Sequence, residues 1–217
     1  MFNYEKRIKL KFKMLAAFYD LFDLAFLLDK KRNPRYALAR KIPDEALRIL
    51  DVCSGTANSS IVVAQANVRN EIICIDLSPD MTAVAHSKAR KRNIRNIFIQ
   101  PMNAIDMSFR DGEFDIVTIS FALHEMDYEM MLKVLRQTCR VLKDGGKLYI
   151  IDYDREDGWF KKLLLSMHLK TFERKHMAQF LKYDWAKTLK DVGFQFISSE
   201  KYLFSKLITA TKRSINS

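Results

Sequence analysis

The feature that most constrains the fold of this chain is a short apolar run that leads into a series of small residues. The run spans residues 47–52 and is rich in aliphatic and β-branched residues, which is typical of a buried parallel strand. Residues 53–57 are small, and Asn58 and Ser59 then offer N-cap side chains for a helix. This order predicts a site where a nucleotide-like cofactor contacts bare backbone N–H groups.

A second apolar run, residues 71–76, ends in a carboxylate. This residue, Asp76, lies 25 positions after Asp51. An acid at the end of the second strand can accept hydrogen bonds from both hydroxyls of an adenosine ribose. The turn and the acid together, in this order and at this spacing, indicate a nucleoside-binding site.

Several segments carry a resemblance to one enzyme family. They are residues 18–20, 50–57, 75–81, 109–124 and 141–148. In these segments the chain is similar to the class I S-adenosylmethionine (SAM)-dependent methyltransferases. Within that class it resembles the ubiquinone/menaquinone C-methyltransferase (UbiE-like) family. The match covers most of the chain from about residue 16 and is specific for the cofactor more than for the substrate.

The resemblance and the strand pattern imply an α/β fold. We expect a Rossmann-like, seven-stranded, mostly parallel sheet with helices on both faces and an antiparallel C-terminal hairpin. The 217 residues, 48% of them hydrophobic, suit a single domain, residues 1–217. Residues 1–42 are expected to form an N-terminal helical lid, or alternatively a helix that only covers a sheet edge. Residues 153–182 are expected to roof the substrate pocket.

The resemblance also implies which residues bind SAM. The turn would hold the methionine moiety, Asp76 the ribose, and Leu77 and Met81 the adenine, although core packing is an alternative for the last two. The carbonyl of Asn103 would accept a hydrogen bond from the adenine amine. The full set of expected cofactor-binding residues is Tyr19, Asp51, Cys53, Ser54, Gly55, Thr56, Asp76, Leu77, Met81, Asn103, Ala104 and Ser120.

The turn departs from the family pattern at two positions where glycine is common, Cys53 and Ala57. Ala57 is a mild change if that position mainly allows close packing of helix and strand. Cys53 matters more if its backbone must adopt positive φ, which costs a non-glycine residue about 1 kcal/mol. A relative that binds SAM without turnover is therefore one alternative function.

Two residues are candidates for catalysis, His124 and Tyr19. His124 follows the predicted strand 114–120, at the sheet edge where α/β proteins place their chemistry. A neutral imidazole there can take a proton from a hydroxyl nucleophile. The alternative is that His124 only hydrogen-bonds backbone. The neighbouring Glu125 either orients His124 or faces solvent. Tyr19 is a candidate through the resemblance alone.

The composition bears on partners and location. The formal net charge of +11 favours anionic surroundings such as an acidic membrane surface, or reflects only general solubility. We interpret the cationic cluster at residues 88–92 as a solvated helix end. The three cysteines lack paired spacing, which favours a reduced, cytoplasmic setting. No apolar run is long enough to span a bilayer, and the histidine spacing predicts no metal site.

The sequence therefore predicts a SAM-dependent methyltransferase that acts on a small, apolar or aromatic, quinol-like acceptor. The rival enzyme function is methylation of nucleic acid, which the positive charge encourages. Against it, the segment after the fourth predicted strand lacks the Asn/Asp-Pro-Pro-aromatic motif of base methylases, and no RNA-binding module is visible. The oligomeric state and the acceptor atom are left open.

Overall fold

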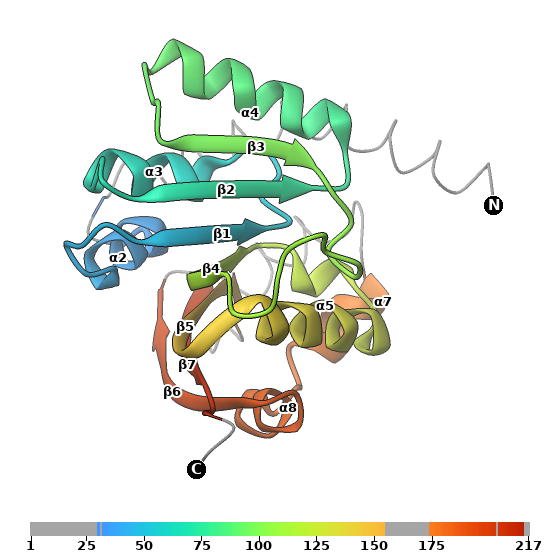
Figure 1. Ribbon diagram of the computed structural model, residues 1–217. Helices are drawn as coiled ribbons and strands as arrows, with labels where there is room; N and C mark the ends of the chain where they lie inside the picture. The colour runs from blue at the N-terminus through green and yellow to red at the C-terminus, as the bar shows by residue number, and fades with distance from the viewer. Residues whose placement is uncertain (1–29, 31, 155–173, 203, 215–217) are drawn as a thin grey trace. The chain divides into compact units, whose positions relative to one another are not determined.

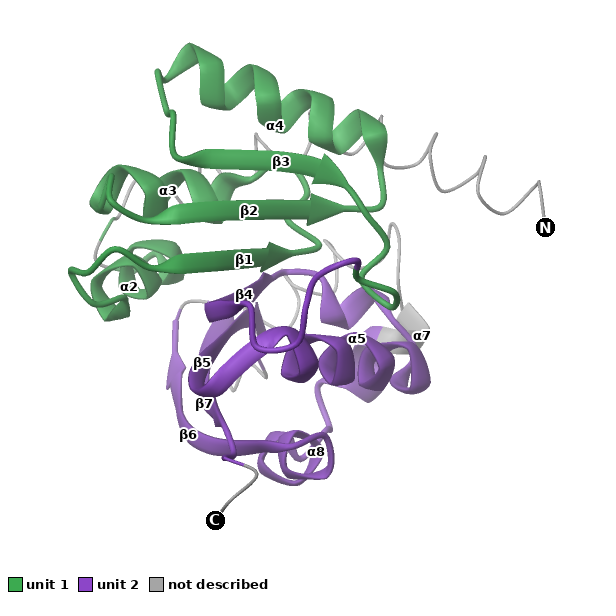
Figure 2. Cartoon of the chain, in the orientation of Figure 1, with its two compact units in different colours: residues 1–107 green, residues 108–217 purple. Residues whose placement is uncertain are grey.

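A computed structural model describes residues 30, 32–154, 174–202 and 204–214 of the chain. The expected lid, up to residue 29, and the expected roof over residues 155–173 lie outside the described residues, as does Tyr19. The chain divides into two compact units, Met1–Met107 and Ser108–Ser217, which are coloured separately in Figure 2. The single-domain organisation stays a prediction.

The first unit contains three parallel strands in the order β3-β2-β1. They are β1 (Arg48–Val52), β2 (Glu71–Asp76) and β3 (Ile97–Pro101). The unit also holds helices α2 (Pro34–Lys41), α3 (Asn58–Ala66) and α4 (Pro79–Lys91) (Figure 1). Aliphatic side chains of β1 and β2 are almost fully buried, in agreement with the apolar runs.

Two of these helices begin at residues that the sequence marks. The side chain of Asn33 accepts a hydrogen bond from Arg35 N–H before α2, and Ser78 accepts one from Met81 N–H before α4. The start of α3 differs from the prediction. Its N-cap is Ala57, in the left-handed conformation and without a side-chain cap, and Asn58 is already the first helical residue.

The second unit contains four strands in the order β4-β5-β7-β6. They are β4 (Phe114–Ser120), β5 (Leu142–Tyr153), β6 (Phe194–Lys201) and β7 (Ser205–Lys212). Strands β4 and β5 are parallel, whereas β5 with β7 and β7 with β6 are antiparallel. The helices are η1 (Leu123–Glu125), α5 (Tyr128–Val141), α7 (Arg174–Phe180) and α8 (Trp185–Asp191). The antiparallel C-terminal hairpin is therefore confirmed.

The boundary between α5 and β5 corrects a prediction. The sequence predicts a helix over residues 130–142 that ends at the glycines of residues 143–146. In the structure α5 ends at Val141, and its C-cap Leu142 is already extended. The helix begins at Tyr128, because the carboxylate of Asp127 accepts a hydrogen bond from Met130 N–H. Gly145 does adopt positive φ, at 73°, but within β5.

The seven strands form a mixed sheet, mostly parallel, with flanking helices. The predicted fold class is thus confirmed. Parallel pairing aligns the carboxyl ends of neighbouring strands, and the loops that follow those ends are where this fold places ligands.

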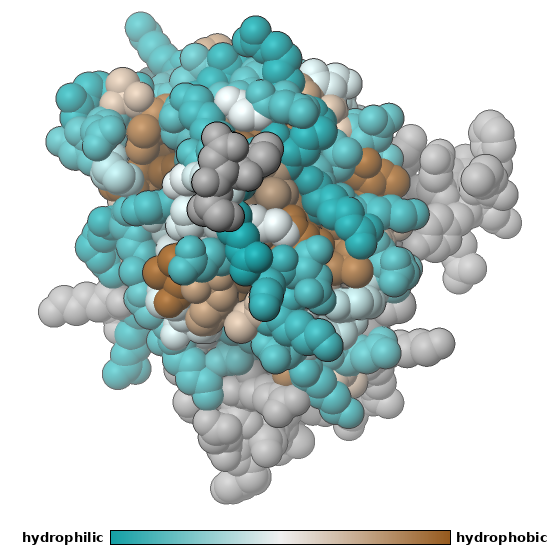
Figure 3. All heavy atoms as spheres, turned by 60° about the horizontal axis from the view of Figure 1, so that its bottom comes forward, coloured by the Kyte–Doolittle hydropathy of each residue, from teal (hydrophilic) through white to brown (hydrophobic). Residues whose placement is uncertain are grey.

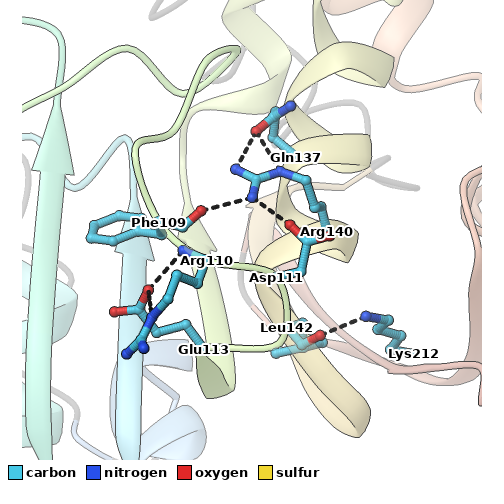
Figure 4. A network of polar contacts seen from close by, with 8 residues as sticks. All are labelled: Phe109, Arg110, Asp111, Glu113, Gln137, Arg140, Leu142 and Lys212. Atoms are coloured by element: carbon cyan, nitrogen blue, oxygen red, sulfur yellow. Dashed lines mark hydrogen bonds and ion pairs between the residues drawn. The ribbon is translucent and has the colours of Figure 1, made fainter.

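A polar network holds the loop before β4 against α5 (Figure 4). The guanidinium of Arg140 donates to the carbonyl of Phe109 and to a carboxylate oxygen of Asp111, each at 2.7 Å, and also to Gln137. The rings of Phe109 and Phe114 pack edge to face at 5.0 Å. These contacts fix the entry into β4 and thereby the strand that leads to His124.

The face drawn in Figure 3 is mostly hydrophilic, with hydrophobic residues in separate smaller areas. The large hydrophobic side chains that are exposed come from different segments: Val68, Leu77, Phe98, Met130 and Ile197. Within the described part of the chain, no helix is long and apolar enough to cross a membrane.

Candidate functional site

The register of the strands brings the predicted cofactor residues of the first unit together at the C-terminal ends of the strands. Val52 pairs with Ile75, and Asp76 pairs with Pro101, so the turn after β1, the acid of β2 and the loop after β3 all leave the same end of the sheet. Two backbone hydrogen bonds extend this alignment, from Ser54 N–H to the carbonyl of Ile75 (2.9 Å) and from Met102 N–H to that of Asp76 (3.0 Å).

The carboxylate of Asp76 connects the loops that follow β1 and β2. One of its oxygens accepts from Gly55 N–H at 2.8 Å, and the other accepts from Ser78 N–H at 2.9 Å. Burial raises the pKa of Asp76 above its ordinary value, and the two backbone hydrogen bonds oppose that shift. A carboxylate offers about four acceptor positions, so two backbone donors leave capacity for ribose hydroxyls.

The turn itself has three residues with positive φ: Cys53 at 55°, Gly55 at 53° and Ala57 at 59°. Cys53 therefore does adopt the positive φ that is costly for a non-glycine residue. The expectation that Ala57 is a mild change is wrong, because Ala57 is fully buried and also left-handed. Each non-glycine residue in this region costs roughly 1–2 kcal/mol. Three N–H groups of the turn donate within the protein: Ser54 N–H to the carbonyl of Ile75, Gly55 N–H to the carboxylate of Asp76, and Ala57 N–H to the carbonyl of Ser54.

Gly55 gives the turn open space. A Cβ atom built on Gly55 would meet nothing within 4 Å, so bare main chain is accessible at this position. The carboxylate of Asp76, with spare acceptor capacity, is hydrogen-bonded to the same residue. Together these residues fit a nucleoside with an amino-acid tail, which is the chemistry of SAM.

A lysine from a distant helix supports the turn. The ammonium of Lys88 on α4 donates to the hydroxyl of Thr56 and to the side-chain carbonyl of Asn58, each at 2.9 Å. The interpretation of residues 88–92 as a merely solvated cluster is therefore wrong for Lys88. No local sequence pattern indicates this contact, because the partners lie about 30 positions apart.

Asp51, also predicted to bind the cofactor, is buried and accepts a hydrogen bond from the hydroxyl of Ser60 in α3. It thereby ties the end of β1 to the following helix. Burial and, next, the charge of Asp51 raise the pKa of the Cys74 thiol well above its ordinary value. A direct contact between Asp51 and the cofactor stays a prediction.

The residues proposed for the adenine differ in exposure. Leu77 is 65% exposed, whereas Met81 is 6% exposed, and contact of either residue with the adenine stays a prediction. Asn103 is exposed, and its side-chain carbonyl accepts from Ile105 N–H at 3.2 Å, while Ala104 is buried. Ser54, in the turn, has a buried hydroxyl with no hydrogen-bond partner among the described residues.

The second unit holds the catalytic candidate His124, in η1 just after β4. Its Nδ1 lies 2.7 Å from a carboxylate oxygen of Asp152, at the end of the neighbouring strand β5. The side chains of both residues are almost fully buried. Sequence reasoning missed Asp152 and considered Glu125, which is half-buried, as the orienting acid. Parallel pairing of Ser120 with Ile151 is the signal that could have found it.

Aromatic rings surround His124. Tyr153 packs edge to face on the imidazole at 4.7 Å between ring centroids, and Phe180 of α7 lies at 6.2 Å. Phe121 contacts Tyr153 at 5.5 Å and has a positive φ of 52°, a strained conformation often found beside functional sites. Ser120, a further predicted cofactor residue, is half-buried, and its hydroxyl has no hydrogen-bond partner in the described part of the chain.

A cationic cavity of about 830 Å³ lies elsewhere in the second unit. Its lining includes Arg136, Arg140, Lys143, Lys212 and Arg213. It also includes Gly112, which precedes β4, whereas His124 follows the other end of that strand. The cavity is therefore not part of the surroundings of His124. Among the described residues, no group of three or more His, Cys, Asp or Glu side chains could hold a metal ion.

The parallel strands, the turn and the Asp76 carboxylate fit a SAM-dependent methyltransferase. The chain belongs to the ubiE/COQ5 methyltransferase family, whose model matches residues 1–198. Its cofactor is therefore SAM. The family resemblance seen in the sequence is confirmed.

Relatives in this family bear names that specify a substrate. The demethylmenaquinone methyltransferase of Listeria welshimeri is 27% identical over 217 residues, with 89% of each chain covered. The enzyme of the same name from Listeria monocytogenes is 31% identical over 161 residues, which are 71% of this chain and 66% of that relative. The one from Geobacillus kaustophilus is 32% identical over 145 residues, 65% of this chain and 61% of that relative.

Solved structures share the fold at lower identity. A SAM-dependent methyltransferase from Aquifex aeolicus superposes with a TM-score of 0.68 at 18% identity, over 84% of this chain and 91% of that chain. The cyclase SpnF superposes with a TM-score of 0.67 at 21% identity, over 83% and 80%. Because the fold also occurs in a protein named as a cyclase, the fold alone does not define the acceptor or the reaction.

Proposed function

We propose that the protein transfers a methyl group from SAM to a small, apolar, aromatic acceptor of the quinol type. The observation that carries this proposal is the imidazole of His124, held by Asp152 among aromatic rings at the carboxyl end of β4. Tyr153 and Phe180 suit a flat, apolar ring. The names of the relatives from Listeria and Geobacillus support a quinone-type substrate.

SAM supplies an activated methyl group on its sulfonium centre when it is bound. The task of the chain is then to hold the acceptor in line and exclude water, and well-oriented reactants recover about 7–11 kcal/mol of barrier. His124 takes the proton from a ring hydroxyl, which raises the electron density of the attacking atom. Tyr19, outside the described residues, is proposed to assist this step.

The cofactor contacts in this proposal follow the geometry of the first unit. The main chain of residues 53–57 contacts the methionine moiety, with open space at Gly55, and Asp76 accepts hydrogen bonds from the ribose hydroxyls. The exposed side chains of Leu77 and Asn103 contact the adenine. Met81 and Asp51 support these residues from within the core.

Two measurements test this function. Isothermal titration measures SAM binding, and release of S-adenosylhomocysteine measures turnover with short-tailed naphthoquinols, phenols, amines and thiols. We expect SAM binding, and release with quinols in preference to amines and thiols. His124→Gln should lower turnover about a hundredfold with little change in SAM affinity. The matched control is His86→Gln, because His86 is exposed on α4. Turnover with amines alone would contradict the quinol assignment.

Methylation of nucleic acid is the second candidate, and the cationic cavity favours it. Tight RNA binding that weakens steeply with added salt, together with turnover on RNA, would establish it. The position of that cavity, at the other end of β4 from His124, argues against it.

The third candidate function is SAM binding without turnover. Its support is the backbone strain at Cys53 and Ala57, which both have positive φ. Release of S-adenosylhomocysteine with any acceptor excludes it.

Peripheral contact with an acidic membrane surface and a cytoplasmic location also belong to the proposal. The support for membrane contact is the net charge of +11 and a substrate class that is lipophilic. Retention on vesicles that contain an anionic lipid, and not on neutral vesicles, is the expected result. Equal retention on both vesicle types would contradict an electrostatic contact.

A further inference from the structure

We propose that Asp152 is a positioning residue that fixes the tautomer of His124, with the proton on Nδ1 and the lone pair on Nε2. The inference rests on the proposed function, in which His124 acts as the base. It extends that function by naming which nitrogen reacts and which residue decides this.

The contacts of Asp152 carry the argument. One carboxylate oxygen lies 2.7 Å from His124 Nδ1 and accepts from its own neighbour, Tyr153 N–H, at 2.8 Å. The other oxygen accepts from Leu123 N–H at 3.0 Å and from His124 N–H at 3.3 Å. A carboxylate with three backbone donors is an acceptor, so Nδ1 must be the fourth donor. In a neutral imidazole this leaves Nε2 without a proton.

The same carboxylate also sets the direction of the ring. It binds the main chain of η1 and the side chain of His124 at once, so the imidazole cannot rotate without the loss of a hydrogen bond in a buried place. His124 is 3% and Asp152 0% exposed, and a polar group left without its partner at such a depth is costly. Nε2, at the far side of the ring from Nδ1, is thereby directed away from Asp152.

This arrangement suits one proton transfer. The O–H bond of the acceptor hydroxyl breaks, its electron pair stays on oxygen, and a new N–H bond forms at Nε2. The imidazolium that results lies against a carboxylate, so the new buried charge is paired rather than isolated. Among the described residues, the Asp152 carboxylate and the Tyr153 ring from β5 and the Phe180 ring from α7 pack against the imidazole. Asp152 thus supplies an anion that faces the ring.

The first test measures the tautomer in the full chain without any substrate. Long-range proton–nitrogen spectra of the ¹⁵N-labelled protein distinguish a protonated ring nitrogen from a bare one. The signals of His124 are assigned by their loss in His124→Gln. We expect Nδ1 protonated and Nε2 bare near pH 8. The opposite tautomer in the wild-type protein would overturn the proposal, and this result does not depend on turnover.

The second test uses Asp152→Asn, with Asp154→Asn as the matched control. Asp154 follows β5 and contacts Lys206 and Lys201. In Asp152→Asn, one of the two acceptor oxygens becomes an N–H₂ group. This group faces either His124 Nδ1 and Tyr153 N–H or the N–H groups of Leu123 and His124, so the tautomer of His124 is no longer fixed. We expect mixed tautomers, turnover lowered about a hundredfold at unchanged SAM affinity, and an acid limb of the pH–rate profile moved to lower pH. The control should match the wild-type protein in all three.

The outcomes separate this inference from the proposed function. A folded Asp152→Asn variant with a wild-type tautomer and pH profile would show that Asp152 only holds η1, and it would overturn the inference. Absence of turnover with every quinol would contradict the proposed function. In that case the tautomer of the wild-type protein still decides the role of Asp152. Unchanged SAM binding reports that the Asp152→Asn variant has folded.

Discussion

Replacement of Asp76 by asparagine tests how the cofactor turn is held. The substitution keeps the size of the side chain but converts one of its two acceptor oxygens into a donor. Those oxygens accept from Gly55 N–H and Ser78 N–H, at 2.8 and 2.9 Å. In either orientation of the new amide, one backbone N–H group therefore faces another donor.

The magnitude follows from two opposing effects. A hydrogen bond to a charged group contributes about 1.5–3 kcal/mol, and one is lost. Burial disfavours the charged form of Asp76, as its raised pKa indicates. Removal of the charge therefore removes this desolvation cost and offsets part of the lost hydrogen bond. We expect the free energy of unfolding to fall by about 2 kcal/mol. SAM affinity should fall at least tenfold, which corresponds to about 1.4 kcal/mol.

Denaturant unfolding and isothermal titration measure the two quantities on the same samples. Asp80→Asn is the matched control, because Asp80 is an exposed carboxylate in the first turn of α4. Its loss should lower the free energy of unfolding by at most about 1 kcal/mol through the helix dipole. SAM affinity of this control should equal that of the wild-type protein.

Two results would refute the reasoning in different ways. If stability falls but SAM affinity stays within a factor of about two, a difference of roughly 0.4 kcal/mol, Asp76 holds the turn and does not bind the ribose. If neither quantity changes, the two backbone hydrogen bonds do not stabilise the turn, and the organisation of the site around Asp76 is wrong.

Three further predictions concern the same turn. The raised pKa of Asp76 means that the folded state holds its proton at higher pH than the unfolded state. The contribution of Asp76 to stability is therefore full below its unfolded pKa and declines as pH rises through its folded pKa. SAM affinity should fall as pH is lowered, because the Asp76 carboxyl becomes protonated. Isothermal titrations between pH 8 and pH 4 measure this fall, and Asp76→Asn should not show it. Cys53→Gly should raise the free energy of unfolding by about 0.5 kcal/mol, because relief of left-handed strain exceeds the entropy that glycine adds to the unfolded chain; a decrease in urea unfolding would contradict the strain. Lys88→Met should lower the free energy of unfolding by about 1–2 kcal/mol and weaken SAM binding, since two hydrogen bonds to the turn are lost. Lys91→Met, at an exposed position of the same helix, should change neither.

Much of the fold could be predicted because the signals are local. The apolar runs before residues 53 and 77 are strands that end at Val52 and Asp76. Ser78 caps α4, which begins at Pro79, as the preference of serine for the N-cap and of proline for the first helical position indicates. Strand burial, turn residues and caps act over a few neighbours, so a single sequence carries them. The turn at residues 53–57 could be predicted for the same reason, and its contact with the cofactor stays a prediction.

The chemistry of the site depended on contacts between distant segments. Lys88 reaches the turn from another helix, and Asp152 meets His124 only because β4 and β5 pair in parallel. Ala57 adopts its left-handed conformation because the chain must enter α3 there, although alanine itself does not favour it. The sequence by itself determined the class of fold, the turn and the position of Asp76, since those rest on neighbouring residues. Tertiary structure decided which side chains support the turn and which carboxylate directs the histidine, because register and burial bring together residues about 30 positions apart.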